Sequence, residues 1–340
     1  MKIHSNIPFF IPHSGCKNSC VFCSQVSITG KSRNQPGLHE ELWELENTLE
    51  SALKTISNGT EVQLAFFGGS FTGIEHERMT ALLKTGYGYI KQGRISSIRV
   101  STRPDYISRS ILELLKAHGV TDIELGIQSI SNRVLRASGR GHTAAASYES
   151  ASLIRDCGFN LAGQMMIGLP LSTARDELDT ADAIIEMGAT SARIYPTVVF
   201  SGTALSDMVR NGTYIPLSEE DAVLHSALCL DKFVRAGVAV LKIGLHSSEG
   251  LAAAEYGANH PAIGELVKSR LYYLRLYEQL KEENCRGKAA VIYVKNGETS
   301  KLTGHGGGVI NRLTREFGLK KIEVMTADVG LYSPVIKIKE

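Results

Sequence analysis

The chain has 340 residues and a formal net charge of +2 at pH 7. Hydrophobic residues make up 43% of it and charged residues 21%, which is ordinary for a chain with a large buried core and excludes wholesale disorder. Six cysteines in this length are too few for a disulfide-stapled secreted scaffold.

The N-terminus carries no recognisable targeting sequence. Its apolar run, within residues 1–12, is short and is interrupted by two prolines, so it does not form the core of a signal peptide. No stretch approaches the roughly 20 apolar residues that span a bilayer. We therefore expect a cytoplasmic protein without membrane contact, in which clustered cysteines bind metal or take part in chemistry.

Short apolar runs alternate with longer helical patterns along the first 260 residues. Seven runs predict strands, at residues 7–12, 62–67, 98–101, 122–126, 163–167, 192–199 and 238–243. Six helical patterns lie between them, at residues 40–56, 78–91, 108–118, 144–157, 174–187 and 218–236. Strands separated by helices indicate parallel βα units, so we predict an α/β fold, a partial or full (β/α) barrel. The pattern alone does not decide between the two.

The pattern of alternating strands and helices changes after about residue 260, and we place a domain boundary there, between residues 1–260 and 261–340. A helix over residues 262–283 leads into a small α/β appendage. Its predicted strands are residues 289–294, 321–325 and 334–339, with a Gly-rich loop at 304–308 and a helix at 309–317. Residues 286–340 hold ten Lys or Arg and five Asp or Glu, which makes this segment basic.

Three cysteines follow the first predicted strand closely. Cys16, Cys20 and Cys23 have the spacing C-x3-C-x2-C, whereas the other three cysteines are scattered. Three thiolates can hold three irons of a [4Fe–4S] cluster and leave the fourth iron open to another ligand. The alternative is a structural zinc site, which needs a fourth ligand; His13 and His39 are the nearest candidates, and neither makes a good second pair.

The cysteine spacing, with Phe22 just before the third cysteine, resembles the signature of the radical S-adenosylmethionine superfamily. Six further segments follow in the order of that family: residues 67–72 (FGGSFT), 101–105 (STRPD), 124–129 (ELGIQS), 140–143 (RGHT), 166–170 (MIGLP) and 194–197 (IYPT). Together they resemble the radical domain of the Elongator catalytic subunit and, more distantly, oxygen-independent coproporphyrinogen oxidase. The resemblance covers about residues 5–260.

The resemblance implies an enzyme with two cofactors, a [4Fe–4S] cluster and S-adenosylmethionine. In that family the reduced cluster cleaves S-adenosylmethionine to a 5′-deoxyadenosyl radical, which abstracts hydrogen from a substrate. Cys16, Cys20 and Cys23 are then the cluster ligands, and the reaction needs a one-electron donor such as flavodoxin or ferredoxin. The implied S-adenosylmethionine contacts are Phe22, Gly68, Gly69, Ser70, Ser101, Arg103, Glu124, Gln128, Arg140 and Gly168.

The implied substrate contacts lie on later strands. Arg193 and Tyr195 alternate on the sixth predicted strand and so share one face. Together with Gln128 they are the candidate catalytic residues. Lys242 and His246, near the last predicted strand, are further candidates.

The substrate stays open at this point. Too few residues follow the predicted barrel for an acetyltransferase domain, so we do not expect acetyl transfer. The basic C-terminal segment makes RNA one possible substrate class. The alternatives are a tetrapyrrole or another small molecule, or a non-catalytic protein that binds or delivers an iron–sulfur cluster or S-adenosylmethionine.

Overall fold

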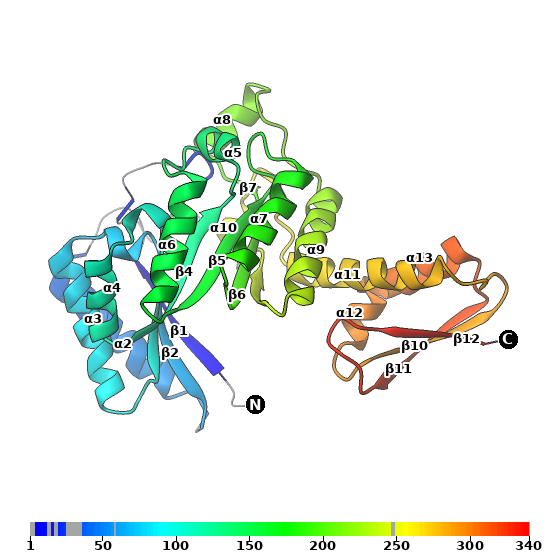
Figure 1. Ribbon diagram of the computed structural model, residues 1–340, viewed down its shortest axis with the longest axis horizontal. Helices are drawn as coiled ribbons and strands as arrows, with labels where there is room; N and C mark the ends of the chain where they lie inside the picture. Colours follow the sequence, from blue (N-terminus) through cyan, green and yellow to red (C-terminus); the bar gives the residue numbers. More distant parts are fainter. Residues whose placement is uncertain are drawn as a thin grey trace.

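A seven-stranded parallel sheet forms the body of the protein (Figure 1). The computed structural model describes residues 4–11, 15–16, 20–24, 36–57, 59–245 and 249–339. The sheet has the order β1-β2-β3-β4-β5-β6-β8. Its strands are β1 (His4–Ile11), β2 (Glu61–Gly68), β3 (Ser97–Thr102), β4 (Val120–Gln128), β5 (Asn160–Ile167), β6 (Ser191–Pro196) and β8 (Ala239–Ile243).

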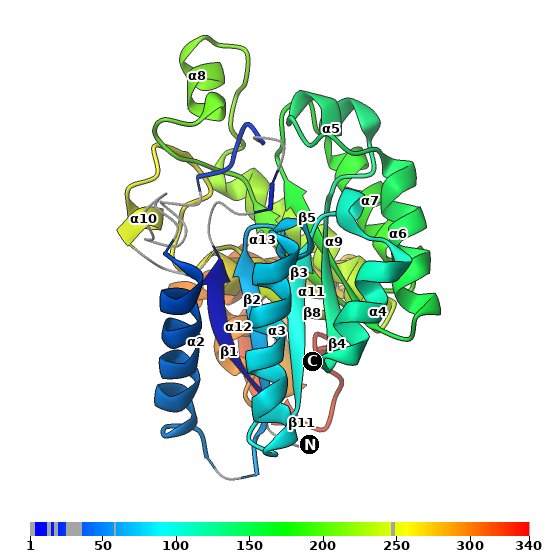
Figure 2. The same ribbon diagram turned by 90° about the vertical axis from the view of Figure 1, so that its left-hand side faces the viewer.

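The sheet curls but does not close. Within the described residues, β1 pairs only with β2 and β8 pairs only with β6, so both edges stay open. The α/β barrel prediction is therefore confirmed in its partial form. Figure 2 shows the curl and places two short helices, α8 (Ala204–Arg210) and α10 (Glu249–Ala252), above the carboxyl ends of the strands.

Helices cover the convex face of the sheet. The long ones are α2 (Leu38–Leu53), α3 (His76–Lys91), α4 (Arg109–Ala117), α6 (Ala144–Asp156), α7 (Ala174–Glu186) and α9 (Glu219–Arg235). A short helix, α5 (Asn132–Ala137), and two 3-10 turns, at Phe71–Gly73 and Pro104–Tyr106, follow strand ends. Each long helix agrees with a predicted helical pattern to within a few residues.

Sequence features explain where these helices lie and begin. In α2, Leu45 and Leu49 have no exposed surface, because their spacing of four residues places them on the face that packs against the sheet. Hydroxyl side chains cap four helix starts by accepting a backbone hydrogen bond. These residues are Ser108, Thr143, Thr173 and Ser218.

One predicted strand, residues 192–199, is broken in the structure. β6 ends at Pro196, and Val198–Val199 forms a separate strand, β7, which pairs antiparallel with β9 (Tyr256–Gly257). Proline has no N–H for the ladder, and the chain leaves the parallel sheet after it. The first predicted strand, residues 7–12, corresponds to the end of β1, and its last residue, Pro12, lies outside the described residues.

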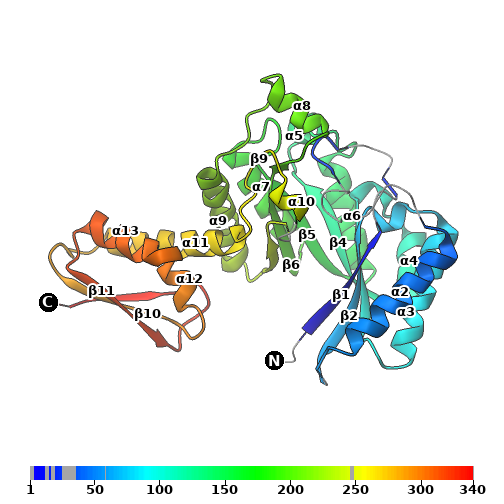
Figure 3. The ribbon, with the colours of Figure 1, turned by 180° about the vertical axis from the view of Figure 1, so that it is seen from behind.

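The C-terminal segment forms a second, smaller sheet with the order β11-β10-β12. Its strands are β10 (Ala289–Lys295), β11 (Lys321–Ala327) and β12 (Val335–Lys339). A long helix, α11 (Ile263–Leu280), leads to it from the barrel, and α12 (Thr299–Thr303) and α13 (Gly308–Phe317) lie with α11 on one side of the small sheet (Figure 3). The predicted Gly-rich loop contains a 3-10 turn, His305–Gly307. Among the described residues, no helix is long and apolar enough to span a membrane.

Candidate functional site

A cavity of about 470 Å³ opens at the carboxyl ends of the barrel strands. Most of its lining is apolar, and this part includes Phe10, Phe22, Phe67, Met166, Tyr195 and Phe200. A few polar side chains complete it: Ser101, Gln128, Gln164, Arg193 and Lys242. An apolar hollow with a small number of placed polar groups is typical of a ligand site.

The three clustered cysteines lie at this end of the barrel. Cys16 and Cys23 are exposed, Cys20 is half-buried, and none of them forms a disulfide. Cys23 lines the cavity. Residues 17–19, between the first two cysteines, lie outside the described part of the chain. Among the residues that the structure describes, no three His, Cys, Asp or Glu side chains are gathered as a metal site.

Two guanidinium groups lie beside the Cys20 thiol. Arg140 Nη1 is 3.3 Å from Cys20 Sγ, and Arg103 Nη1 is 4.0 Å from it. Arg140 also donates to the Gly126 carbonyl at 2.6 Å, and Arg103 is paired with Asp105. The structure therefore places Arg103 and Arg140, two predicted cofactor contacts, beside Cys20, a predicted cluster ligand.

The turn after β2 packs closely against the end of β1. Gly68 has a φ of +104°, and a Cβ at this position would meet the Ile11 carbonyl oxygen at 3.0 Å. The Gly69 N–H donates to the same oxygen at 2.9 Å. Ser70 is buried, with its Oγ 3.5 Å from Cys16 Sγ. Only glycine fits at Gly68, and the result is a turn held beside the first cysteine.

Gln128 is held in an unusual conformation at the end of β4. Its φ is +66°, which is rare for a residue other than glycine, and the β4–β5 register shifts between Gly126 and Gln128. Its side chain lines the cavity and is 8% exposed, and Oε1 is buried without a hydrogen-bond partner. Backbone strain together with an unsatisfied buried acceptor indicates a ligand-binding position.

The turn after β5 is fixed from two sides. The Gly168 N–H donates to Glu177 Oε1 at 2.7 Å, and the Gly168 carbonyl accepts from the Tyr214 hydroxyl at 2.5 Å. Glu177 is buried and lies 2.8 Å from His225 Nδ1. Burial raises the pKa of the Glu177 carboxyl, although the Gly168 N–H and His225 oppose the shift. The backbone of this turn is therefore rigid.

A charged network fills the barrel interior around Glu124, which has no exposed surface. Its carboxylate accepts from Arg99 Nη1 at 3.2 Å, Arg193 Nη2 at 2.9 Å and Gln164 Nε2 at 2.9 Å. Arg99 is also paired with Asp122 at 3.0 Å. The predicted contact residue Glu124 is thus fully engaged by the protein itself.

Sequence reasoning missed the lower members of this network, Gln63 and Arg99. Gln63 Oε1 accepts from Arg99 Nε at 2.7 Å, and Gln63 Nε2 donates to Asp122 at 2.7 Å. A signal was present, since each of these strands carries one polar residue between apolar neighbours. Such a residue in a buried strand is expected to find a polar partner inside the barrel.

Arg193 and Tyr195 both line the cavity, as their alternation predicts. The Arg193 guanidinium lies over the Phe67 ring, 5.1 Å from its centroid. Burial raises the pKa of the Tyr195 hydroxyl, so this group is a neutral donor at ordinary pH. Lys242 lines the cavity from the edge strand, and His246 lies outside the described residues.

The remaining predicted contacts, Ser101 and Phe22, also line the cavity. Ser101 Oγ accepts from Gln164 Nε2 at 3.1 Å, which ties it to the network. Phe22 packs as well against a small cluster formed by Val199, Leu205 and Tyr214.

His142, just after Arg140, is a buried titratable group near the same arginines. It is 7% exposed. Burial, together with repulsion from Arg140 and Arg103, lowers its pKa from 6.5 to about 4. The imidazole is therefore neutral at physiological pH.

Comparison with protein families matches most of the barrel. Residues 10–184 match the model described as the Radical SAM superfamily, and residues 189–273 match the Radical_SAM C-terminal domain. The first match covers half of the chain.

Several curated proteins are similar over part of the chain. The tRNA uridine(34) acetyltransferase of Methanocaldococcus infernus is 31% identical over 133 residues, 38% of this chain and 25% of that protein. Elongator complex protein 3 of Homo sapiens is 34% identical over 129 residues, 37% of this chain and 24% of that protein. The chain therefore matches only about a quarter of the length of these relatives. An uncharacterized protein of Methanocaldococcus jannaschii is 25% identical over 65% of this chain and 68% of its own length.

Solved structures show the same fold. The archaeal Methanocaldococcus infernus Elp3 with an N-terminal deletion has a TM-score of 0.59 at 19% identity, over 83% of this chain and 63% of that chain. Coproporphyrinogen III oxidase (HemN) from Escherichia coli has a TM-score of 0.50 at 19% identity, over 69% of this chain and 53% of that chain. At these identities the likeness concerns the fold alone.

Proposed function

The chain belongs to the radical S-adenosylmethionine superfamily, and from that premise we propose that it is an enzyme whose barrel holds a [4Fe–4S] cluster and S-adenosylmethionine. Bound together, these groups supply a 5′-deoxyadenosyl radical that abstracts a hydrogen atom from a substrate. The electron comes from a one-electron donor such as flavodoxin or ferredoxin. The single observation that carries this proposal is the family match over the segment that contains all three clustered cysteines.

The residues present fit these groups. Cys16, Cys20 and Cys23 supply the thiolates that iron–sulfur clusters prefer, and they lie at the open end of the barrel. Arg140 compensates the negative charge that a thiolate brings to Cys20. The unpaired acceptor of Gln128 lies in the cavity beside them and is available to a ligand.

The S-adenosylmethionine contacts that we propose are those that the family resemblance implies, and the chemistry of each residue suits its role. Gly68 and Gly69 allow close backbone approach to the methionine amino group, with Ser70 beside them. The guanidinium groups of Arg103 and Arg140 suit its carboxylate. Ser101 and Gln128 suit the ribose hydroxyls, and Phe22 and the Gly168 turn form one wall for adenine. Glu124 acts through its neighbours, because it fixes Arg193 and Gln164 from below.

The substrate-facing residues in this proposal are Arg193, Tyr195 and Gln128. Arg193 and Tyr195 present a fixed cation and a neutral hydroxyl to the same cavity, and both can orient a polar group of a substrate.

We place the barrel in residues 1–260, and the connecting helix and basic appendage in residues 261–340. This boundary falls just before α11, which packs on the barrel helix α9 at one end and on α12 and α13 at the other.

RNA is the substrate class that we favour. Two supports are independent of each other: the relatives named above include a tRNA uridine(34) acetyltransferase, and the C-terminal segment is strongly basic. A small molecule such as a tetrapyrrole is the second candidate, in keeping with the sequence resemblance to coproporphyrinogen oxidase.

Anaerobic reconstitution tests the proposed activity. Protein supplied with iron, sulfide, dithionite and S-adenosylmethionine is expected to turn brown and to form 5′-deoxyadenosine. A protein that binds the cluster and S-adenosylmethionine without forming 5′-deoxyadenosine is a carrier, and the enzymatic proposal is then wrong.

Substitution of one cysteine tests the cluster assignment. Cys20→Ala is expected to abolish the brown absorbance and 5′-deoxyadenosine formation while the barrel stays folded by circular dichroism. The matched control is Cys157→Ala, on the outer helical layer and away from the cavity, which is expected to keep the full cluster spectrum. A wild-type spectrum in Cys20→Ala would refute this ligand.

A further inference from the structure

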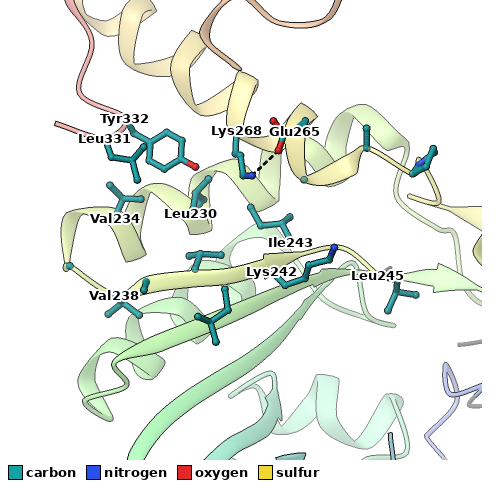
Figure 4. Close-up of a pocket in the computed structure, with 17 residues that line it drawn as sticks. Leu230, Val234, Val238, Lys242, Ile243, Leu245, Glu265, Lys268, Leu331 and Tyr332 are labelled. Atoms are coloured by element: carbon teal, nitrogen blue, oxygen red, sulfur yellow. Dashed lines mark hydrogen bonds and ion pairs between the residues drawn. The ribbon is translucent and has the colours of Figure 1, made fainter. Parts of the chain in front are cut away.

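A second cavity, of about 580 Å³, lies on the outer side of the barrel's open edge (Figure 4). The edge strand β8 forms one wall, and α9 and the first turns of α11 form others. Leu331 and Tyr332, from the loop before β12, complete the lining from the C-terminal segment. This outer cavity is thus built by the barrel and the appendage together.

The outer cavity adjoins the cavity of about 470 Å³ inside the barrel, here called the lumen, at the carboxyl end of β8. Lys242 and Leu245 line both of them. Lys242 is the register partner of Arg193 on β6, so it belongs to the same wall of the lumen as that arginine. The junction between the two cavities therefore has a cation on it.

Lys242 is the unbalanced charge at this junction. In the lumen, Arg193 is paired with Glu124, and Arg99 with Asp122. In the outer cavity, Lys268 is paired with Glu265 at 2.8 Å, as the dashed line in Figure 4 shows. Within the described part of the chain, Lys242 has no ion-pair or hydrogen-bond partner. A half-buried ammonium without a protein partner is suited to an anionic group of a ligand.

We propose that the lumen and the outer cavity form one elongated site for a single-stranded RNA segment, with a backbone phosphate at Lys242. One base enters the lumen, the phosphate beside it contacts the Lys242 ammonium, and the flanking nucleotide occupies the outer cavity. This inference rests on the proposed function and adds the path of the substrate to it.

Charge complementarity selects a nucleotide chain as the occupant. An RNA strand places one negative charge between successive bases, which matches a mainly apolar lumen and a mixed polar and apolar outer cavity with one unpaired cation at their junction. The segment that supplies Leu331 and Tyr332 carries ten Lys or Arg against five Asp or Glu over residues 286–340. The strand therefore continues from the outer cavity toward a region of excess positive charge.

Binding of a fluorescein-labelled single-stranded RNA of about a dozen nucleotides tests the phosphate contact. Fluorescence anisotropy is measured over a salt series for the wild type, Lys242→Gln, Lys242→Arg and a control, Lys84→Gln, an exposed lysine on α3. We expect Lys242→Gln to weaken binding about tenfold and to reduce the slope of log K against log salt by about 0.7, the value for one lost contact on a single strand. Lys242→Arg and the control should keep the wild-type slope.

A second variant separates a chain from a free nucleotide. Ala262→Trp, at an exposed position on the rim of the outer cavity, is expected to weaken RNA binding severalfold and to leave binding of uridine 5′-monophosphate unchanged. Equal affinity for the mononucleotide and the RNA would overturn the elongated site. A poly-glutamate peptide that competes as well as RNA of equal charge would overturn the nucleotide assignment.

The outcomes distinguish this inference from the proposed function. If the reconstituted wild type forms 5′-deoxyadenosine but Lys242→Gln binds RNA with wild-type affinity and slope, the inference alone is wrong. If RNA binding depends on Lys242 but no 5′-deoxyadenosine forms, the proposed enzymatic function alone is wrong.

Discussion

Polar residues are paired with one another in the lower interior of the barrel, around Glu124, but not at its open end, where the carboxyl ends of the strands lie. In the lower interior, Arg99, Asp122 and Glu124 satisfy one another through short ion pairs. At the open end, Gln128 keeps a buried acceptor unpaired and a strained backbone, and Lys242 has no partner among the described residues. A polar group buried without a partner lowers stability, so a fold retains it where a ligand completes the bonding.

This contrast separates residues that hold the barrel from residues whose polar groups are available to a ligand. A family motif does not make the distinction, since Glu124 and Gln128 belong to one short motif, ELGIQS. Four residues apart on one strand, the first is taken up by three protein partners and the second faces the cavity. Substitution of Glu124 should therefore reduce stability more than ligand affinity, and substitution of Gln128 should reduce ligand affinity more than stability.

The largest effect on stability is expected for Glu124→Gln. The substitution removes the charge that pairs with Arg193 and leaves that guanidinium buried and uncompensated, which costs about 3–5 kcal/mol of unfolding free energy. Urea unfolding of the cluster-free protein measures it. The control is Asp179→Asn, which breaks the exposed pair with Arg175 and should cost less than about 0.5 kcal/mol. A similar small loss for both variants would refute the structural role of the network.

Sequence reasoning predicted the layers of the fold well and its interior poorly. The helical period of residues 40–56 and the hydroxyl caps are local signals, and they place α2 and the capped helices. The pairing of Arg99 on β3 with Asp122 on β4 depends on register between strands more than 20 residues apart, and the β3–β4 register shifts near Ile98. No local pattern specifies that shift.

The second effect is a pH dependence that belongs to His142. Its folded pKa of about 4 lies below the unfolded value of 6.5, so the folded state favours the neutral imidazole. Stability from this preference is complete above pH 6.5 and is lost as the pH falls toward 4, by up to about 3 kcal/mol. His142→Asn is expected to lose stability less steeply between pH 7 and 4.5 than the wild type, in urea unfolding of the cluster-free protein.

A surface histidine provides the control for that slope. His118→Asn alters a part-exposed imidazole at the C-cap of α4, and it should keep the wild-type pH dependence. If His142→Asn and the wild type lose stability in parallel, the buried imidazole does not carry the slope.

Sequence reasoning produced a set of candidate site residues, whose roles stay predictions, but it did not predict their conformation. The order of the motifs brought Phe22, Ser101, Gln128, Arg193 and Tyr195 to one list, and all five line one cavity. The positive φ of Gln128 and the second cavity beyond β8 were not foreseen. Both arise from tertiary packing, at a register shift and at an interface between segments distant in sequence.

The smallest effect, and the sharpest comparison, comes from two glutamines. Gln164 donates to Glu124 and Ser101, so Gln164→Ala removes two hydrogen bonds, one of them to a buried carboxylate, and should cost about 1–3 kcal/mol of stability. Gln128→Ala removes a buried acceptor that has no partner, so it should not lower the unfolding free energy. In reconstituted protein, the same Gln128→Ala should weaken S-adenosylmethionine binding about tenfold, the effect of one lost hydrogen bond of about 1.4 kcal/mol. Equal losses of stability in both variants would mean that Gln128 belongs to the structural network after all, and the division between the lower interior and the open end would then fail at its boundary.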